Sequence, residues 1–144
     1  MPSADALRVT DLIPVELDEQ GLVALEGGDD RRTRVDYRAI EAIAAAEVAG
    51  LAEAPVLVVD LVLRAPRPGR PRSVLRIRSD GFDPAALFPE RTDAGQALHA
   101  LLAELLDRSG AVPLPDPDSA LGVRPHRFES LAAFEAAIQS RLGE

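Results

Sequence analysis

Arginine is the residue type whose spacing in this chain could do chemistry. One apolar run, the proline-rich segment after it and the next apolar run carry six of the sixteen basic residues: Arg64, Arg67, Arg70, Arg72, Arg76 and Arg78. Guanidinium groups bind phosphates and carboxylates through paired hydrogen bonds. The cluster therefore predicts an anion-binding tip for a phosphate, an acidic peptide or a lipid headgroup. The alternative is an edge hairpin that charge and proline keep from aggregating.

The chain offers few other side chains for catalysis or metal binding. It has two histidines, His99 and His126, and no cysteine, and the spacing of the histidines does not bring them to a carboxylate as a zinc site requires. Two pairs of carboxylates flank turns: Asp80 with Asp83, and Asp116 with Asp118. Aspartates at such positions form turns and caps, and no hydrolase, phosphate-binding or dinucleotide motif occurs. We therefore expect a non-enzymatic protein with no catalytic residue, no metal and no cofactor.

Composition and charge limit the class of protein. The 144 residues suffice for one domain with a substantial core, and 47% of them are hydrophobic, as in globular proteins. A net charge of −8 argues against binding to nucleic acid or to an anionic membrane, since both are negatively charged. No secretory signal opens the chain, and its apolar regions are too often interrupted by charge to span a membrane. We expect a soluble cytoplasmic protein without stable membrane insertion.

The arginine cluster lies in a predicted hairpin, whose strands span Pro55–Arg64 and Ser73–Ser79. One face of the first strand is entirely apolar, and the other carries Asp60, which we expect to be partly hydrated or covered by polar groups. In the second strand, apolar residues alternate with Arg76 and Arg78, which we expect to point to solvent. The two strands therefore predict an antiparallel hairpin with a single core face.

A long amphipathic helix follows this hairpin. Thr92 or Asp93 can cap its N-terminus, it runs to Ser109, and Gly110 can end it in a left-handed conformation. Its leucines recur at spacings of three and four residues on one face: Leu98, Leu101, Leu102, Leu105 and Leu106. Such a stripe needs an apolar partner, and the nearest is the apolar face of the hairpin. We predict that this leucine-rich helix closes a mostly β core.

The segments before the hairpin predict short strands. Leu7–Leu17 contains two apolar runs, and Pro14 confines the second to an edge or a broken strand. Gly21–Glu26 and Arg32–Tyr37 predict a hairpin around a turn of glycines and aspartates. These segments would join the strands of the central hairpin in one sheet.

The alanine-rich segment Tyr37–Gly50 is ambiguous. Alanine favours a helix, and several apolar residues fit helical spacing. The segment nevertheless lies between strands, lacks a good cap after Tyr37 and reaches Gly50 within a few turns. We predict one helical turn at Tyr37–Ile40, followed by a strand through Val48.

The C-terminal part predicts an appendage to the core. The proline-rich stretch Ala111–Asp118 is expected to be an extended connector. Ser130 can then cap a short last helix, whose apolar side chains lie along one side: Leu131, Phe134, Ile138 and Leu142. We divide the chain into a β core with its capping helix at 1–110, and a connector with a C-terminal helix packed on the same domain at 111–144.

The order of these elements resembles that of bacterial pleckstrin-homology-like domains over about Leu7–Ser109. The residues that carry the resemblance are Tyr37–Ile40, at the turn into a strand, and Ser73–Ser79. The resemblance implies an α+β fold in which a bent antiparallel β-sheet or barrel is closed by a C-terminal helix. The first hairpin has Gly27–Asp30 in place of a basic headgroup motif, and the tryptophan common in the eukaryotic closing helix is absent. Phosphoinositide binding is therefore not carried over.

Three hypotheses about function follow. The first is a protein–protein interaction module that binds its partner through the arginine-rich hairpin, a free sheet edge or the C-terminal helix, with a homodimer through a sheet edge as one form of it. The second is an acidic secretion-type chaperone that binds a client protein; such chaperones resemble dimeric α/β folds that open with a helix, whereas Leu7–Leu17 predicts strand. The third is an enzyme with a hidden carboxylate site involving Asp60, Asp80 and Asp83.

Overall fold

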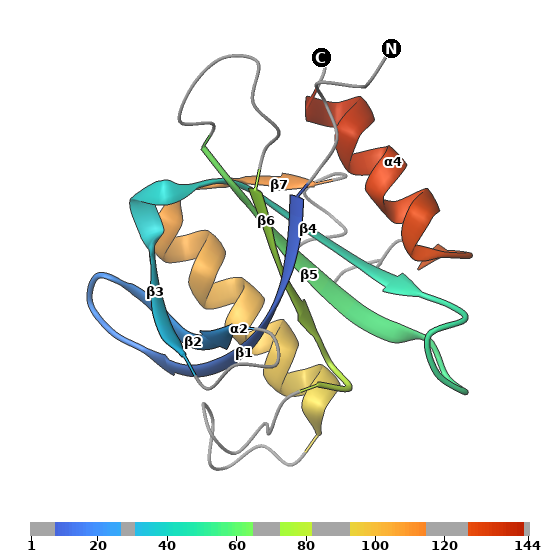
Figure 1. The fold of residues 1–144 in the computed structure, drawn as a ribbon, viewed down its shortest axis with the longest axis horizontal. Helices are drawn as coiled ribbons and strands as arrows, with labels where there is room; N and C mark the ends of the chain where they lie inside the picture. The colour runs from blue at the N-terminus through green and yellow to red at the C-terminus, as the bar shows by residue number, and fades with distance from the viewer. Residues whose placement is uncertain (1–7, 27–30, 65–72, 82–92, 115–126, 143–144) are drawn as a thin grey trace.

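The computed structural model describes residues 8–26, 31–64, 73–81, 93–114 and 127–142 (Figure 1). Within these ranges the chain forms β1 (Arg8–Leu17), β2 (Gly21–Glu26), β3 (Arg32–Asp36), a 3-10 turn η1 (Tyr37–Ala39), β4 (Ile40–Val48), β5 (Val56–Leu63), β6 (Ser73–Arg78), α2 (Ala94–Ser109), β7 (Val112–Leu114), β8 (Arg127–Phe128) and α4 (Leu131–Leu142). The strands form one eight-stranded sheet in the order β3-β2-β1-β6-β5-β4-β7, with β8 also paired to β4. The fold is α+β, as predicted, and these described strands do not close into a barrel.

The sheet is mixed and not antiparallel throughout. The pairs β1·β2, β2·β3, β4·β5 and β5·β6 are antiparallel, which confirms both predicted hairpins. The pairs β1·β6, β4·β7 and β4·β8 are parallel. These contacts join segments that no short turn connects, so nothing local imposes an antiparallel direction on them. The prediction of a purely antiparallel sheet is therefore wrong for these pairs.

Strand β1 belongs to both halves of the sheet. Its first residues, Arg8–Asp11, pair with β6, whereas Leu12–Leu17 pair with β2. A register shift lies between Pro14 and Glu16, and such bulges bend and twist a strand locally. Figure 1 shows β1 curving from one half to the other. The two apolar runs predicted in Leu7–Leu17 thus contribute, from Arg8 onward, to one continuous, bent strand.

Pro14 fits within β1 because its nitrogen points away from β2. The Glu26 N–H donates to the Arg31 carbonyl of the β3 side at 3.1 Å, so the even-numbered residues of β2 direct their backbone groups towards β3. Ala24, which lies opposite Pro14, is one of these residues. The pair Pro14/Ala24 therefore makes no ladder hydrogen bond, and the missing proline N–H removes none.

Each face of the sheet carries its own apolar layer, and Figure 1 shows α2 and α4 on different sides of it. On one face the leucines of α2 cluster with β5: Leu98, Leu101, Leu102 and Leu105 with Leu57, Val59 and Leu61. On the other face α4 supplies the cover: Phe134 and Ile138 with Val58, Val62 and Val74. Strand β5 is therefore buried on both faces, and the prediction of a hairpin with a single core face is wrong.

Both helices begin where their capping residues predict. The Asp93 carboxylate accepts the Gln96 N–H at 3.0 Å, and Gly110 ends α2 with φ 67° while its N–H donates to the Leu106 carbonyl at 3.2 Å. The Ser130 hydroxyl accepts a backbone N–H from the first turn of α4 at 3.2 Å. These local signals satisfy backbone groups that a helix end leaves without partners.

The prediction for the alanine-rich segment is confirmed. One 3-10 turn, Tyr37–Ala39, is capped by Asp36, whose carboxylate accepts the Arg38 N–H at 2.9 Å, and β4 follows directly. The alanines at 42–46 are all buried, because β4 is paired with β5 along its length and is covered on both faces. Tertiary pairing therefore overrides the helical preference of alanine.

The α2 layer makes a direct prediction about stability. Replacing the fully buried Leu101 by alanine should lower the free energy of unfolding by about 2–5 kcal/mol, because it removes apolar contacts and leaves a cavity. Val112→Ala is the control, since the Val112 side chain is 58% exposed, and we expect a change within about 0.5 kcal/mol. Urea unfolding followed by circular dichroism measures both, and equal losses would contradict a core centred on α2.

Candidate functional site

The predicted arginine tip is described only in part. Three of its members lie outside the described residues: Arg67, Arg70 and Arg72. Arg64 is exposed, and its Nε donates to the Arg38 carbonyl at 2.9 Å. Arg78 forms two hydrogen bonds with the Asp80 carboxylate at 2.9 and 2.7 Å, and these lower the pKa of Asp80. Arg64 and Arg78 thus already bind groups of the chain itself, and so does Arg76, the third described member.

Arg76 does not point to solvent, and the prediction of its exposure is wrong. Its side chain is 5% exposed and lies under α4. Nε and Nη2 donate to the two oxygens of Asp60 at 2.9 and 2.8 Å, and Nη2 also donates to Glu135 of α4 at 3.1 Å. Asp60 is fully buried directly opposite Arg76 in the β5·β6 ladder. The charged pair is buried because α4 covers this face of the sheet.

Burial and pairing oppose each other in this network. Burial raises the pKa of the Asp60 carboxyl, and the hydrogen bonds and charge of Arg76 act against that rise. Burial lowers the pKa of Arg76, but the hydrogen bonds and charges of Asp60 and Glu135 together raise it. The bidentate geometry satisfies both charged groups inside an apolar layer. The arrangement connects β5, β6 and α4, and it leaves neither Asp60 nor Arg76 accessible to a ligand.

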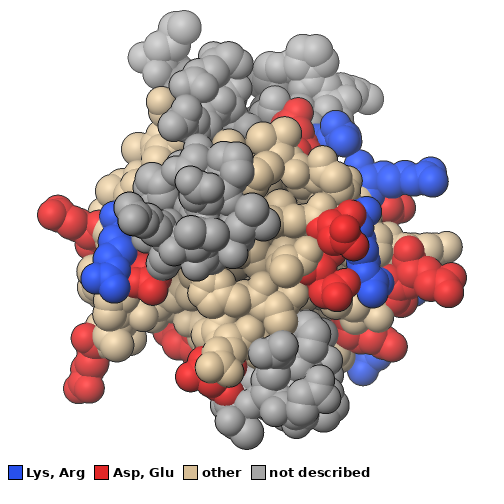
Figure 2. Space-filling model, turned by 180° about the vertical axis from the view of Figure 1, so that it is seen from behind, with Lys and Arg blue, Asp and Glu red and all other residues tan. Residues whose placement is uncertain are grey.

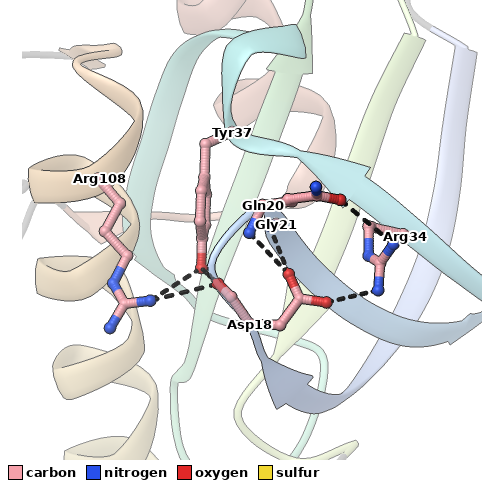
Figure 3. A network of polar contacts seen from close by, with 6 residues as sticks. All are labelled: Asp18, Gln20, Gly21, Arg34, Tyr37 and Arg108. Carbon is pink, nitrogen blue, oxygen red and sulfur yellow. Dashed lines mark hydrogen bonds and ion pairs between the residues drawn. The ribbon is translucent and has the colours of Figure 1, made fainter.

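A second polar network lies at the corner where the β1–β2 turn, β3, η1 and α2 meet (Figure 3). The Asp18 carboxylate accepts the N–H groups of Gln20 and Gly21 at 2.8 and 2.9 Å, which closes the turn. Its other oxygen pairs with Nη2 of Arg34 on β3 at 2.6 Å. The backbone N–H of Gln20 lowers the pKa of Asp18; burial opposes this, while Gly21 and Arg34 add to it. Asp18 is therefore an ionised link between the turn and β3.

Tyr37 and Arg108 join this corner to α2. The buried Tyr37 ring directs its hydroxyl to the Asp18 carbonyl, to which it donates at 2.8 Å. Nη1 of Arg108 donates to the Tyr37 hydroxyl and to the same carbonyl, each at 3.3 Å, and its guanidinium lies 5.9 Å from the Tyr37 ring centre. Figure 3 shows the Arg108 side chain reaching from α2 and the Tyr37 side chain reaching from η1 to the same point at the turn. The corner thus holds the end of β3 in a defined position.

Strand β3 lies at one end of the described sheet, at this corner. The Tyr37 N–H donates to the Gln20 carbonyl at 3.0 Å, so the odd-numbered residues of this segment direct their backbone groups to β2. The backbone groups of Arg32, Arg34 and Asp36 therefore point away from the sheet, and no strand in the described ranges pairs with them. We call the outward backbone groups and the side chains of these three residues the β3 edge.

The side chains of the β3 edge share the outer face of the sheet. Arg32, Arg34 and Asp36 are all exposed, whereas Val35 is buried in the core and Thr33 is half-buried. With the described residues, Arg32 forms no ion pair, and Arg34 pairs only with Asp18. An edge strand with alternating charges is protected against indiscriminate pairing. The same backbone groups can accept an added strand whose charges match.

The other candidate residues are described only in part. His99 lies half-buried on α2, whereas His126, Asp83, Asp116 and Asp118 lie outside the described residues. Within the described ranges, no three histidine, aspartate or glutamate side chains are grouped to hold a metal ion. No helix in that part of the chain is long and apolar enough to cross a membrane. Of the three aspartates in the hypothesis of a hidden carboxylate site, Asp60 and Asp80 each bind an arginine, and Asp83 lies outside the described residues.

Charged side chains are mixed over the surface. On the face in Figure 2, acidic and basic side chains are interspersed around the margin, and much of the visible surface between them is uncharged. A single-sign field, such as a nucleic-acid interface needs, is not seen on this face.

Comparison with known protein families, with curated proteins and with solved structures finds no match to this chain. Sequence reasoning missed the pairing of Asp60 with Arg76, although an isolated acid in one strand and a base in the next were a signal for it. It named a sheet edge without locating it. The alternating charges of Arg32, Arg34 and Asp36 were the signal for the β3 edge.

The buried Asp60–Arg76 pair predicts that substitutions of its two members have non-additive effects on the free energy of unfolding. Asp60→Leu should lower the free energy of unfolding by roughly 3–5 kcal/mol, because it leaves Arg76 buried without its main partner. The double variant Asp60→Leu/Arg76→Met should be much closer to the wild type, since both desolvated charges are gone. Urea unfolding of the wild type, both single variants and the double variant measures the coupling. Additive losses would contradict it.

The Asp18 contacts at this corner predict that the stability of the protein depends on pH. Because folding lowers the pKa of Asp18, its charge stabilises the protein above the ordinary aspartate pKa of about 3.9, and this contribution is lost as the pH falls through the lower folded value. Asp18→Asn keeps an oxygen for the turn but removes the charge. Its thermal midpoint should be lower than that of the wild type at pH 7, and the difference should shrink below about pH 4. A difference independent of pH between 7 and 2 would exclude the charge as its cause.

Proposed function

We propose that this chain is a non-enzymatic protein-binding module with a pleckstrin-homology-like β core, and that it binds an extended segment of a cytoplasmic partner by strand addition to the β3 edge. The observation that carries the proposal is the row of outward backbone groups at Arg32, Arg34 and Asp36. An extended peptide that joins such an edge gains main-chain hydrogen bonds, and its alternate side chains provide specificity.

Preorganisation of the edge supports this function. Arg34 is tied to the turn through Asp18, and Tyr37, directly after β3, is tied to Asp18 and Arg108. A partner therefore does not have to order this strand when it binds, which removes one of the main costs of association. The corner contacts are structural in this proposal, and the edge is the surface that meets the partner.

Two features support the pleckstrin-homology-like assignment: the bend of the sheet and the packing of α2 on one of its faces. The sheet bends through β1, and α2 follows the β meander and packs against one face of it. A domain of that kind serves as a scaffold for many binding functions, so the assignment adds no ligand of its own. For the secretion-chaperone alternative we expected an opening helix, whereas the first elements in the described residues are β1, β2 and β3. This order favours the binding module.

Site-specific photocrosslinking tests the proposal. The full chain, carrying a photoreactive side chain in place of the exposed Arg32 and expressed in its native cell, should form an adduct with a defined protein. The same group at the exposed Asp107 on α2 should not form that adduct.

Two edge variants show whether the adduct depends on strand addition. Arg34→Pro removes an outward N–H without breaking the ladder with β2, so it should abolish the adduct. Arg34→Ala keeps that N–H and should retain most of the adduct. Folding of each variant is checked by circular dichroism. A folded protein that forms no adduct at residue 32, or an adduct unaffected by Arg34→Pro, would refute binding at the β3 edge.

A further inference from the structure

We infer that the segment captured by the β3 edge is acidic and has a specific order of charges: a basic residue, then two acidic residues, at alternate positions of an antiparallel strand. This inference rests on the proposed function, because it names the partner of the same surface. The evidence for this order of charges is the register of β3 and the exposed charges on it.

The order of charges follows from the geometry of the edge. Residues directly opposite in an added strand lie within about 4.5–5.5 Å between Cβ atoms, so opposite charges attract and like charges repel. Arg32, Arg34 and Asp36 present two positive charges and one negative charge on the outer face. Read from its N-terminus, an antiparallel partner therefore places a basic residue opposite Asp36 and then acidic residues opposite Arg34 and Arg32.

The intervening residues of the partner face the other side of the sheet. On that side β3 presents Thr33, which is half-buried, and Val35, which belongs to the α2 core layer. Apolar β-branched residues fit such positions. The complementary segment is thus base–apolar–acid–apolar–acid, for example Arg-Val-Glu-Val-Glu.

The ion pair at the corner does not remove Arg34 from this interaction. Asp18 occupies Nη2 of Arg34 at 2.6 Å, and Gln20 accepts from Nη1 at 3.5 Å. A guanidinium group has five N–H donors in a planar fork, so it can serve a second carboxylate. Arg32 forms no ion pair with the described residues, and its charge is directed to the outer face.

A second copy of this chain is a poorer occupant. When two β3 strands pair antiparallel with full overlap, Arg32 lies opposite Asp36 of the other copy, but Arg34 lies opposite the second Arg34. Like charges placed directly opposite are destabilising. The edge is therefore better matched by a different, acidic segment than by itself.

Fluorescence anisotropy with a labelled peptide tests this inference. The probe is a peptide containing Arg-Val-Glu-Val-Glu. The control peptide contains the same residues with the base in the middle, Glu-Val-Arg-Val-Glu, which places like charges opposite Arg34 and Asp36 in either strand direction. The full-length protein should bind the first peptide more tightly. The protein variant Arg32→Glu/Arg34→Glu should bind it roughly tenfold more weakly, because two attractions become repulsions. A peptide with Arg in place of both Glu should recover binding to that variant only.

Matched variants locate the binding and separate the outcomes. Arg8→Glu makes a single charge reversal at an exposed residue of β1 away from β3, and it should leave the affinity within about twofold. Arg34→Pro should abolish binding of the matched peptide. The inference is supported if the Arg32→Glu/Arg34→Glu variant loses the matched peptide but binds the peptide with Arg in place of both Glu, and if Arg34→Pro loses the matched peptide.

Three results would overturn it. Equal binding of both peptides that is lost in Arg34→Pro would refute the charge order but keep strand addition at β3. No binding to folded protein at millimolar peptide would refute the acidic segment, while the crosslinking at residue 32 independently decides strand addition. A dimer in light scattering that Arg34→Pro dissociates would make a second copy the occupant.

Discussion

The burial of β5 on both faces is the constraint on which the rest of the structure depends. One face of this strand packs against the leucines of α2, and the other contributes to the layer that α4 covers. A strand in this position must be almost entirely apolar, and any charge in it needs a partner. Asp60 satisfies this condition through Arg76 on the neighbouring strand, and Glu135 extends the network to α4. The charged pair is thus a consequence of two-sided burial.

Because β5 is buried on both faces, it cannot contact a partner, and a binding surface must lie elsewhere on the protein. Its most deeply buried ionisable groups are neutralised within the protein, so they hold elements together and do not meet ligands. The half of the sheet beyond β1 is different, because β3 ends it without a further described strand. The Asp18 corner ties this edge to α2, and no described strand pairs with its outward backbone groups. The strand addition that we propose rests on this support of β3 and on outward backbone groups that no described strand pairs.

Expectations from the sequence succeeded where the determining interactions are local. The caps of α2 and the turn at Tyr37–Ala39 depend on neighbouring residues. The strand Ile40–Val48 was also predicted, but it depends on its pairing with β5. Expectations failed for Arg76, because alternation shows which residues share a face but not what covers that face. A sheet edge was predicted as a candidate site, but the strand that forms it could be identified only from the strand order.

The residue pattern alone determined that the chain has two hairpins and a helix with a leucine face, since turn residues, caps and periodicity act within a few residues. It also places a charged residue at every second position of Arg32–Asp36. Only the tertiary structure decided that β1 pairs with β6, that α4 covers Asp60 and Arg76, and that β3 lies at the end of the described sheet. Those contacts join residues far apart in the chain, so they depend on how whole elements pack and not on any local preference.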